Sequence, residues 1–202
     1  MPLRNRVTPF GELVAVPERG MFMGNRGLLH NREREIVRFH QVRRWISCTL
    51  EFRGQRRPLM EPGMYTELFF LDEATALAAG HRPCFLCRRP EALRFRAAWA
   101  EATGNDSSIA ADAFDRLLHD DRLASRGVMR RWPTDGTTLP DGATVAVGGE
   151  AFLVRGGALL GWSPGGYVEA RPMPGVVEVL TPRAIVAAIG AGYAPVLHPT
   201  AG

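Results

Sequence analysis

Two cysteines separated by two residues are the strongest chemical signal in this sequence. Cys84 and Cys87 lie just before Pro90, and proline is favoured at the first position of a helix. Two thiolates at C-x-x-C spacing can turn toward one soft cation, and zinc–sulfur bonds of ~2.3 Å require sulfurs that converge. A redox dithiol is the alternative, but such a pair usually follows a strand in a βαβ unit, whereas a short helix is predicted here. The motif therefore favours a metal site.

The third cysteine lies upstream, in a predicted strand. Residues 45–53 are rich in aromatic and β-branched side chains, and alternation places Cys48 on the apolar face with Ile46. Residues 65–71 form a further predicted strand, and Asp72 caps a predicted helix over residues 73–79 that ends at Gly80. This order brings the C-x-x-C motif beside the strand that carries Cys48. The sequence therefore predicts a zinc site formed by all three cysteines.

Three thiolates leave one position of a tetrahedral zinc for nitrogen, oxygen or water. We favour His30, because the turn at residues 23–27 can hold it beside the sheet. The other histidines are weaker candidates. His40 also flanks this region, and His81 is close in sequence to Cys84. His119 and His198 could be ligands only if the fold brings them near the cysteines.

The region around the motif resembles a known family. A strand ending in Phe69-Phe70, a short alanine-rich helix, Gly80, and then Arg82-Pro83-Cys84-x-x-Cys87 resemble the metal-binding N-terminal domain of the Ada methylphosphotriester-repair family over about residues 66–90. The resemblance implies a zinc knuckle beside a small sheet, and contact with the nucleic-acid backbone. That family has a second cysteine pair upstream, which includes its methyl-accepting nucleophile. Only Cys48 lies upstream here, so the resemblance supports zinc binding and not methyl transfer.

Two further patterns bear on catalysis. The segment Pro83-Cys84-x-x-Cys87 matches half of the zinc deaminase signature, but the required H-x-E or C-x-E is absent upstream.

Asp115 and His119 are four residues apart in a predicted helix, so they face the same way. They are candidate proton carriers together with His30, although a solvated ion pair is the more common outcome for such a pair.

Composition limits the class of protein. The chain has 202 residues, and 46% of them are hydrophobic, as in a globular fold. An odd number of cysteines, three, argues against a disulfide framework. No apolar run approaches the ~18 residues of a membrane span, and the N-terminus lacks the apolar region of a secretory signal. We therefore expect a cytoplasmic protein that does not enter a membrane.

Every basic residue other than histidine is an arginine, and the arginines are unevenly distributed. Residues 1–100 contain 17 arginines against 10 acidic residues, and residues 101–202 contain 8 against 11. Coding bias explains the missing lysine but not the excess in one half. Because the guanidinium fork suits phosphate, we expect the first half to contact nucleic acid, DNA more than RNA. The candidate contacts are Arg43, Arg44, Arg56, Arg57, Arg88 and Arg89.

The predicted fold is α+β. A small antiparallel sheet with the zinc knuckle and three helices occupies residues 1–127. A β-rich sheet or partial barrel with a terminal helix occupies residues 128–202, where glycine turns separate short strands. The two segments are either separate domains or one packed unit.

Together these patterns predict a zinc-binding protein that contacts the nucleic-acid backbone in DNA repair, sensing or regulation. The alternatives are a zinc-dependent enzyme that acts on nucleic acid or nucleotides through an open metal site, and a structural zinc module that binds another protein.

Overall fold

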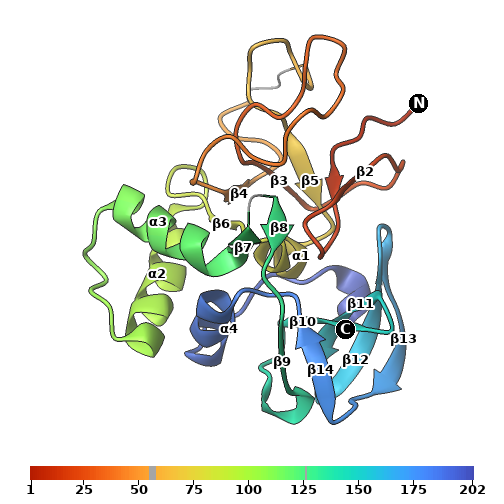
Figure 1. The fold of residues 1–202 in the computed structure, drawn as a ribbon, viewed down its shortest axis with the longest axis vertical. Coiled ribbons are helices and arrows are strands. Elements are labelled where there is room, and N and C mark those ends of the chain that lie inside the picture. The colour runs from red at the N-terminus through yellow and green to blue at the C-terminus, as the bar shows by residue number, and fades with distance from the viewer. Residues whose placement is uncertain (55–57, 126) are drawn as a thin grey trace.

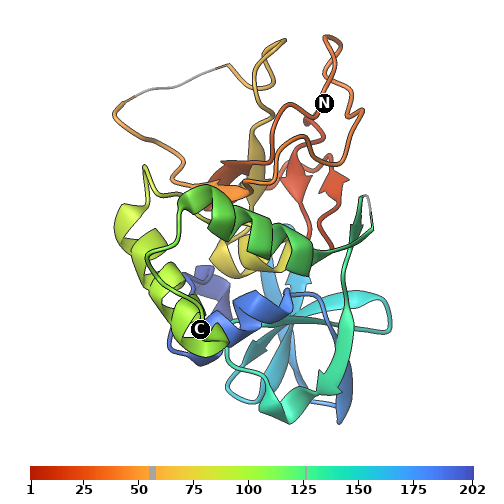
Figure 2. The same ribbon diagram turned by 60° about the vertical axis from the view of Figure 1, so that its left-hand side comes forward.

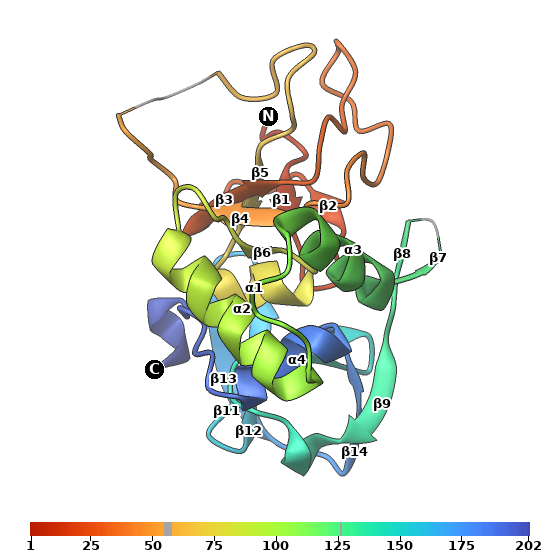
Figure 3. The ribbon, with the colours of Figure 1, turned by 90° about the vertical axis from the view of Figure 1, so that its left-hand side faces the viewer.

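The computed structural model describes residues 1–54, 58–125 and 127–202. Within this part of the chain there are two six-stranded sheets, and the first lies above the second with loops extending beyond it (Figure 1). The four α-helices lie between them when the molecule is viewed from the side (Figure 3). This arrangement confirms the predicted α+β class. None of the helices in the described residues combines the length and the apolar character that a bilayer span requires.

The first sheet carries the N-terminal residues and has the strand order β2-β1-β5-β3-β4-β6. It is mixed rather than purely antiparallel, because β1 pairs in parallel with β5, and β4 with β6. Both β4 and β5 are antiparallel to β3, and helix α1 returns the chain in the direction of β5, so β6 becomes parallel to β4. The strands are β1 (Arg6–Val7), β2 (Leu13–Val14), β3 (Phe22–Asn25), β4 (Ile46–Cys48), β5 (Leu68–Phe70) and β6 (Arg82–Pro83).

The strand that carries Cys48 is shorter than predicted. It ends at Cys48, and the expected alternation fails because Trp45 and Ser47 are fully buried while Leu50 is 54% exposed. Both faces of β4 are covered, so a pattern with one buried face does not describe it. The β-branched and aromatic residues at positions 36, 37 and 39 favour a strand over residues 35–40, but none forms there, and only an isolated bridge joins Ile36 to His30. The connection from β3 to β4 extends away from the second sheet (Figure 2).

The second sheet is antiparallel, with the order β13-β12-β11-β10-β14-β9, and it is open within the described residues. The glycine turns predict strands at residues 144–147, 151–154, 158–162, 167–170 and 176–180, and five strands lie close to these positions. The polar composition of residues 126–140 predicts a linker, but the sixth strand, β9, lies within this range. Pro133 lies within β9, and proline is tolerated there because β9 is an edge strand. The strands are β9 (Trp132–Asp135), β10 (Thr144–Val147), β11 (Glu150–Arg155), β12 (Ala158–Ser163), β13 (Gly166–Pro172) and β14 (Val176–Val179).

The helices join the two halves of the chain. Helix α1 (Glu73–Ala78) is buried along its whole length, begins at the predicted cap Asp72, and is followed by Gly80 at φ 77°. Helices α2 (Arg89–Thr103) and α3 (Ala111–Arg122) share one apolar core with the terminal helix α4 (Arg183–Gly190). The boundary predicted after residue 127 falls within a small hairpin, β7 (Leu123–Ser125) and β8 (Val128–Met129).

Candidate metal centre

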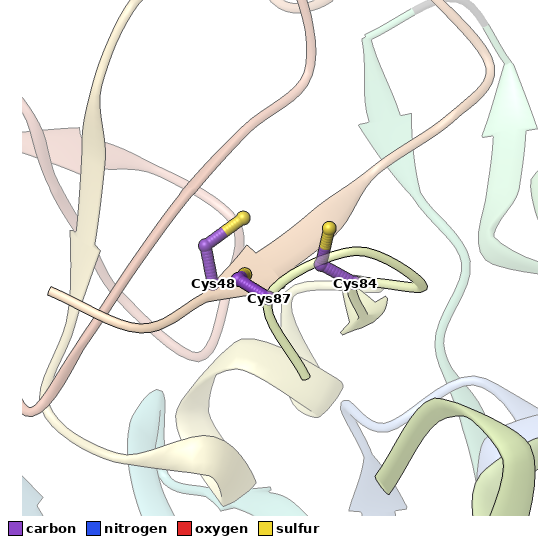
Figure 4. A group of neighbouring side chains, drawn as sticks. All are labelled: Cys48, Cys84 and Cys87. Atoms are coloured by element: carbon purple, nitrogen blue, oxygen red, sulfur yellow. The ribbon is translucent and has the colours of Figure 1, made fainter. Parts of the chain in front are cut away.

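The sulfur atoms of Cys48, Cys84 and Cys87 all lie within 4.8 Å of one another. Figure 4 shows Cys48 on the orange strand β4 and the other two on the loop that follows β6. A tetrahedral ion with metal–sulfur bonds of ~2.3 Å separates its sulfurs by about 3.8 Å. The three side chains therefore need to close by only about 1 Å or less to hold one ion. The predicted grouping of the three cysteines is present.

Strand pairing explains why the three sulfurs meet. Ser47 pairs with Pro83 in the parallel β4–β6 ladder, and the backbone N–H of Cys84 donates to the carbonyl of Ser47 at 3.0 Å. This bond fixes Cys84 beside Cys48. The chain then turns, with the N–H of Arg88 donating to the carbonyl of Cys84 at 3.1 Å, and this turn returns Cys87 to the cluster. Cys48 and Cys84 are buried, and Cys87 is partly exposed.

The thiols of the cluster differ in pKa. The pKa of Cys84 is lowered because the thiols of Cys48 and Cys87 donate to its sulfur, as does the N–H of Leu86 at 3.4 Å. The pKa of Cys48 is raised because its thiol donates to Cys84 and Cys87 and because it is buried. Metal binding requires thiolates, so loading this centre releases protons.

Arg88 supports the centre from inside the protein. Its guanidinium forms an ion pair with Glu73 of α1 at 2.8 Å, donates to the hydroxyl of Ser47 at 3.0 Å, and stacks over Phe22 at 4.3 Å. The side chain of Arg88 is 3% exposed. The prediction that Arg88 contacts nucleic acid is therefore wrong, because its charge is already paired with a buried carboxylate. The sequence did not indicate this pairing, because an acidic residue in the first turn of a helix is common whether or not it is buried.

The predicted fourth ligand, His30, does not join the cysteines. Its Nδ1 lies 2.6 Å from the Thr66 hydroxyl and its Nε2 lies 3.2 Å from the Glu61 carbonyl, so both ring nitrogens have partners elsewhere. Among the described residues, no histidine or carboxylate extends the three-sulfur group.

The other two catalytic candidates, Asp115 and His119, have partners other than each other. Asp115 is buried and forms a two-bonded ion pair with Arg82, at 2.8 and 2.7 Å, rather than a solvated pair with His119. His119 instead packs against the rings of His40 and Trp45, at centroid distances of 5.0 and 6.0 Å. Neither residue belongs to the three-sulfur group.

Comparison with family models, curated proteins and solved structures finds no match for this chain.

The remaining arginines predicted to contact nucleic acid differ in position. Arg43, Arg44 and Arg89 are exposed. Arg89 begins α2 beside the cysteine loop, whereas Arg43 and Arg44 precede β4, at the end of that strand opposite to Cys48. Arg56 and Arg57 lie outside the described residues.

Proposed function

We propose that this chain is a zinc protein in which Cys48, Cys84 and Cys87 bind one Zn²⁺. The observation that carries the proposal is the convergence of three sulfurs from two separate elements within 4.8 Å. Thiolates are soft ligands, and they favour Zn²⁺ over the hard cations Mg²⁺ and Ca²⁺. Resemblance to the Ada metal-binding domain supports the same ion.

The fourth position of this zinc has no protein donor among the described residues. Three protein ligands with one open position is the arrangement that lets zinc take a water or an exogenous ligand. Cys87 is partly exposed and Leu86 beside it is 67% exposed, so solvent reaches this side of the centre.

We further propose that the zinc-bearing half contacts the nucleic-acid backbone. Exposed guanidinium groups support this proposal. Arg89 adjoins the cysteine cluster, and Arg43 and Arg44 lie just before β4, the strand that carries Cys48. The excess of arginine in the first half supports it more weakly than the count alone suggests. Among the described arginines of residues 1–100, three (Arg26, Arg82 and Arg88) are buried and are not available to a nucleic acid.

A mobility-shift titration over a range of salt concentrations tests the nucleic-acid proposal. The triple variant Arg43→Ala, Arg44→Ala, Arg89→Ala should bind duplex DNA less tightly, and the slope of log K against log salt should fall by about 0.9 for each lost phosphate contact. Arg171→Ala, which removes an exposed charge from the second sheet, is the matched control and should bind as the unaltered chain does. Absence of binding to DNA and RNA at low salt would refute the contact.

The open fourth position also favours a second candidate, a zinc-dependent enzyme. Zinc in such a site lowers the pKa of a bound water and supplies a nucleophile. The proton carriers expected from the sequence, His30, Asp115 and His119, are engaged elsewhere and do not adjoin this centre. Metal-dependent turnover of a nucleic acid or nucleotide, lost in Cys84→Ser, would favour this candidate. Retained fold with neither turnover nor polyanion binding would favour a structural module that binds another protein.

A further inference from the structure

A second candidate site lies at the other end of the strands that carry the metal centre. In the β3–β4 ladder, Met23 pairs with Cys48 at one end, and Asn25 pairs with Ile46 at the other. Arg26 follows Asn25 directly. Beside Arg26 is a cavity of about 600 Å³ between the β1–β2 hairpin, residues 36–39 and Gly127. This volume is typical of sites for small molecules.

Arg26 is one of the residues that line this cavity, and no carboxylate neutralises its charge within the described residues. The residue is fully buried, its Nη2 donates to the Gly11 carbonyl at 3.0 Å, and its guanidinium stacks on Phe39 at 4.0 Å and on Trp45 at 4.8 Å. Its Nε and Nη1 have no hydrogen-bond partner, and no carboxylate pairs with it in the described part of the chain. Burial lowers the pKa of Arg26 to about 9, which still leaves it charged at neutral pH. A buried cation of this kind is costly unless an anion compensates it.

Two exposed arginines line the same cavity. Arg38 has no hydrogen bond or ion pair within the described ranges, and Arg4 uses only its Nε, which donates to the Leu13 carbonyl at 2.9 Å. Glu12 is the one acidic side chain in the lining. Three guanidiniums against one carboxylate give the cavity a net charge of +2, which favours an anionic occupant.

The rest of the lining is largely apolar. Leu13, Val14, Ile36 and Phe39 contribute side chains to the wall. A cavity with apolar walls and a few convergent polar groups holds the body of an organic molecule and fixes one end of it. Arginine is well suited to that role because its fork matches the two oxygens of a carboxylate or a phosphate.

We propose that this cavity binds a small organic oxyanion, a phosphate monoester or a carboxylate attached to an apolar or aromatic body. Arg38 and Arg4 contact the anionic group, Arg26 supplies positive potential from below, and Phe39 packs against the body. This site is distinct from the cysteine cluster, and the proposal does not depend on whether the centre holds zinc.

Calorimetric titration of the full chain with adenosine 5′-monophosphate and with benzoate tests the proposal, with adenosine as the uncharged comparison. The phosphate and the carboxylate distinguish the two forms of the anion. Arg38→Ala should weaken binding about tenfold, because it removes a charge-assisted hydrogen bond. Glu12→Gln should tighten binding, because it removes the one like charge from the lining. Both residues are exposed, so neither change disturbs the core.

Arg32→Ala is the matched control. Arg32 is exposed and lies in the same connection between β3 and β4, but it does not line the cavity, so the affinity should stay unchanged. Opposite shifts for Arg38→Ala and Glu12→Gln cannot come from a general loss of fold. The proposal is overturned if neither anion binds at millimolar concentration, if adenosine binds as well as its phosphate, or if Arg32→Ala weakens binding as much as Arg38→Ala does.

Discussion

His81 and His119 lie outside the cysteine cluster, and their surroundings in the folded protein lower their pKa values. His81 is fully buried, with its ring 5.2 Å from that of Trp45 and 4.7 Å from that of Phe70. Burial lowers the pKa of His81 well below its usual range, and the positive charges of Arg26 and Arg122 lower it further. Burial, together with Arg122 and His40, likewise lowers the pKa of His119 to about 4. Both histidines are therefore neutral in the folded protein at neutral pH.

These shifts predict that the protein loses stability in mild acid. An unfolded histidine takes up a proton near pH 6.5, whereas folded His119 does so only near pH 4. The unfolded state thus binds more protons in this interval. The contribution of His119 to the free energy of unfolding is therefore fully present above pH 6.5 and is lost as the pH decreases toward 4. His119→Gln should reduce the fall in urea midpoint between these two pH values. An equal fall in both proteins would contradict this role for His119.

The sequence revealed the cysteines but not the partners of most polar residues around them. The C-x-x-C pair is a local pattern, and a predicted strand was enough to add Cys48. His30 was misassigned because its partners Thr66 and Glu61 lie more than 30 residues away in the chain. Arg88 and Arg89 are adjacent, yet one is paired inside the protein and the other is exposed. Charge counts carry no information about which of two neighbouring arginines faces the core.

The loop between β6 and α2, which carries Cys84 and Cys87, depends on one arginine that joins three segments. Arg88 links the start of α2 to Ser47 on β4 and to Glu73 on α1. Ser47 precedes Cys48, and Arg88 follows Cys87. The hydrogen bond between Arg88 and Ser47 therefore holds Cys87 close to Cys48.

Removing the charge of Arg88 should therefore be costly. Arg88→Met leaves the carboxylate of Glu73 buried without its ion-pair partner, and the free energy of unfolding should fall by about 3–5 kcal/mol. Arg89→Met alters an exposed neighbour in the same turn and should change it by at most about 0.5 kcal/mol. Urea denaturation of both variants measures the difference. Similar values for the two would show that the Arg88 pair does not support the loop.

Local rules predicted some elements well and others poorly. Asp72 and Gly80 mark helix ends in the sequence, and the structure has helix ends at both. Strand β9 was missed because a proline normally counts against a strand, and only its edge position makes Pro133 acceptable. The alternation predicted for residues 45–53 failed because helices and loops from elsewhere in the chain cover both faces of β4.

In the molecule as a whole, helix α1 connects the half that carries the three cysteines to the second sheet. The carboxylate of Asp72 accepts hydrogen bonds from the Tyr167 hydroxyl of β13 at 2.8 Å and from the N–H of His198 at 3.1 Å. Glu73 accepts from the Tyr193 hydroxyl and from the N–H of Val196. Residues from the last third of the chain thus hold the helix that precedes the cysteine loop.

A small change in the second sheet should consequently destabilise the half that carries the three cysteines. Tyr167→Phe removes a hydrogen bond to a buried carboxylate and should lower the free energy of unfolding by about 1.5–3 kcal/mol. Val168→Ala, at an exposed neighbouring position in β13, is the control and should have little effect. Cysteine alkylation and amide exchange in the second sheet should shift to the same midpoint in urea. A shift in the second sheet alone would mean that the halves unfold independently.

X-ray absorption at the zinc edge, measured on the purified full chain together with its metal content, is the decisive experiment on the proposal that Cys48, Cys84 and Cys87 bind a single zinc ion. We predict one zinc per chain with three sulfurs at ~2.3 Å and one lighter ligand, and loss of the ion in Cys48→Ser and Cys84→Ser but not in Leu86→Ala. A protein without stoichiometric metal, or one whose zinc persists unchanged in Cys48→Ser, would rule out zinc binding by these three cysteines.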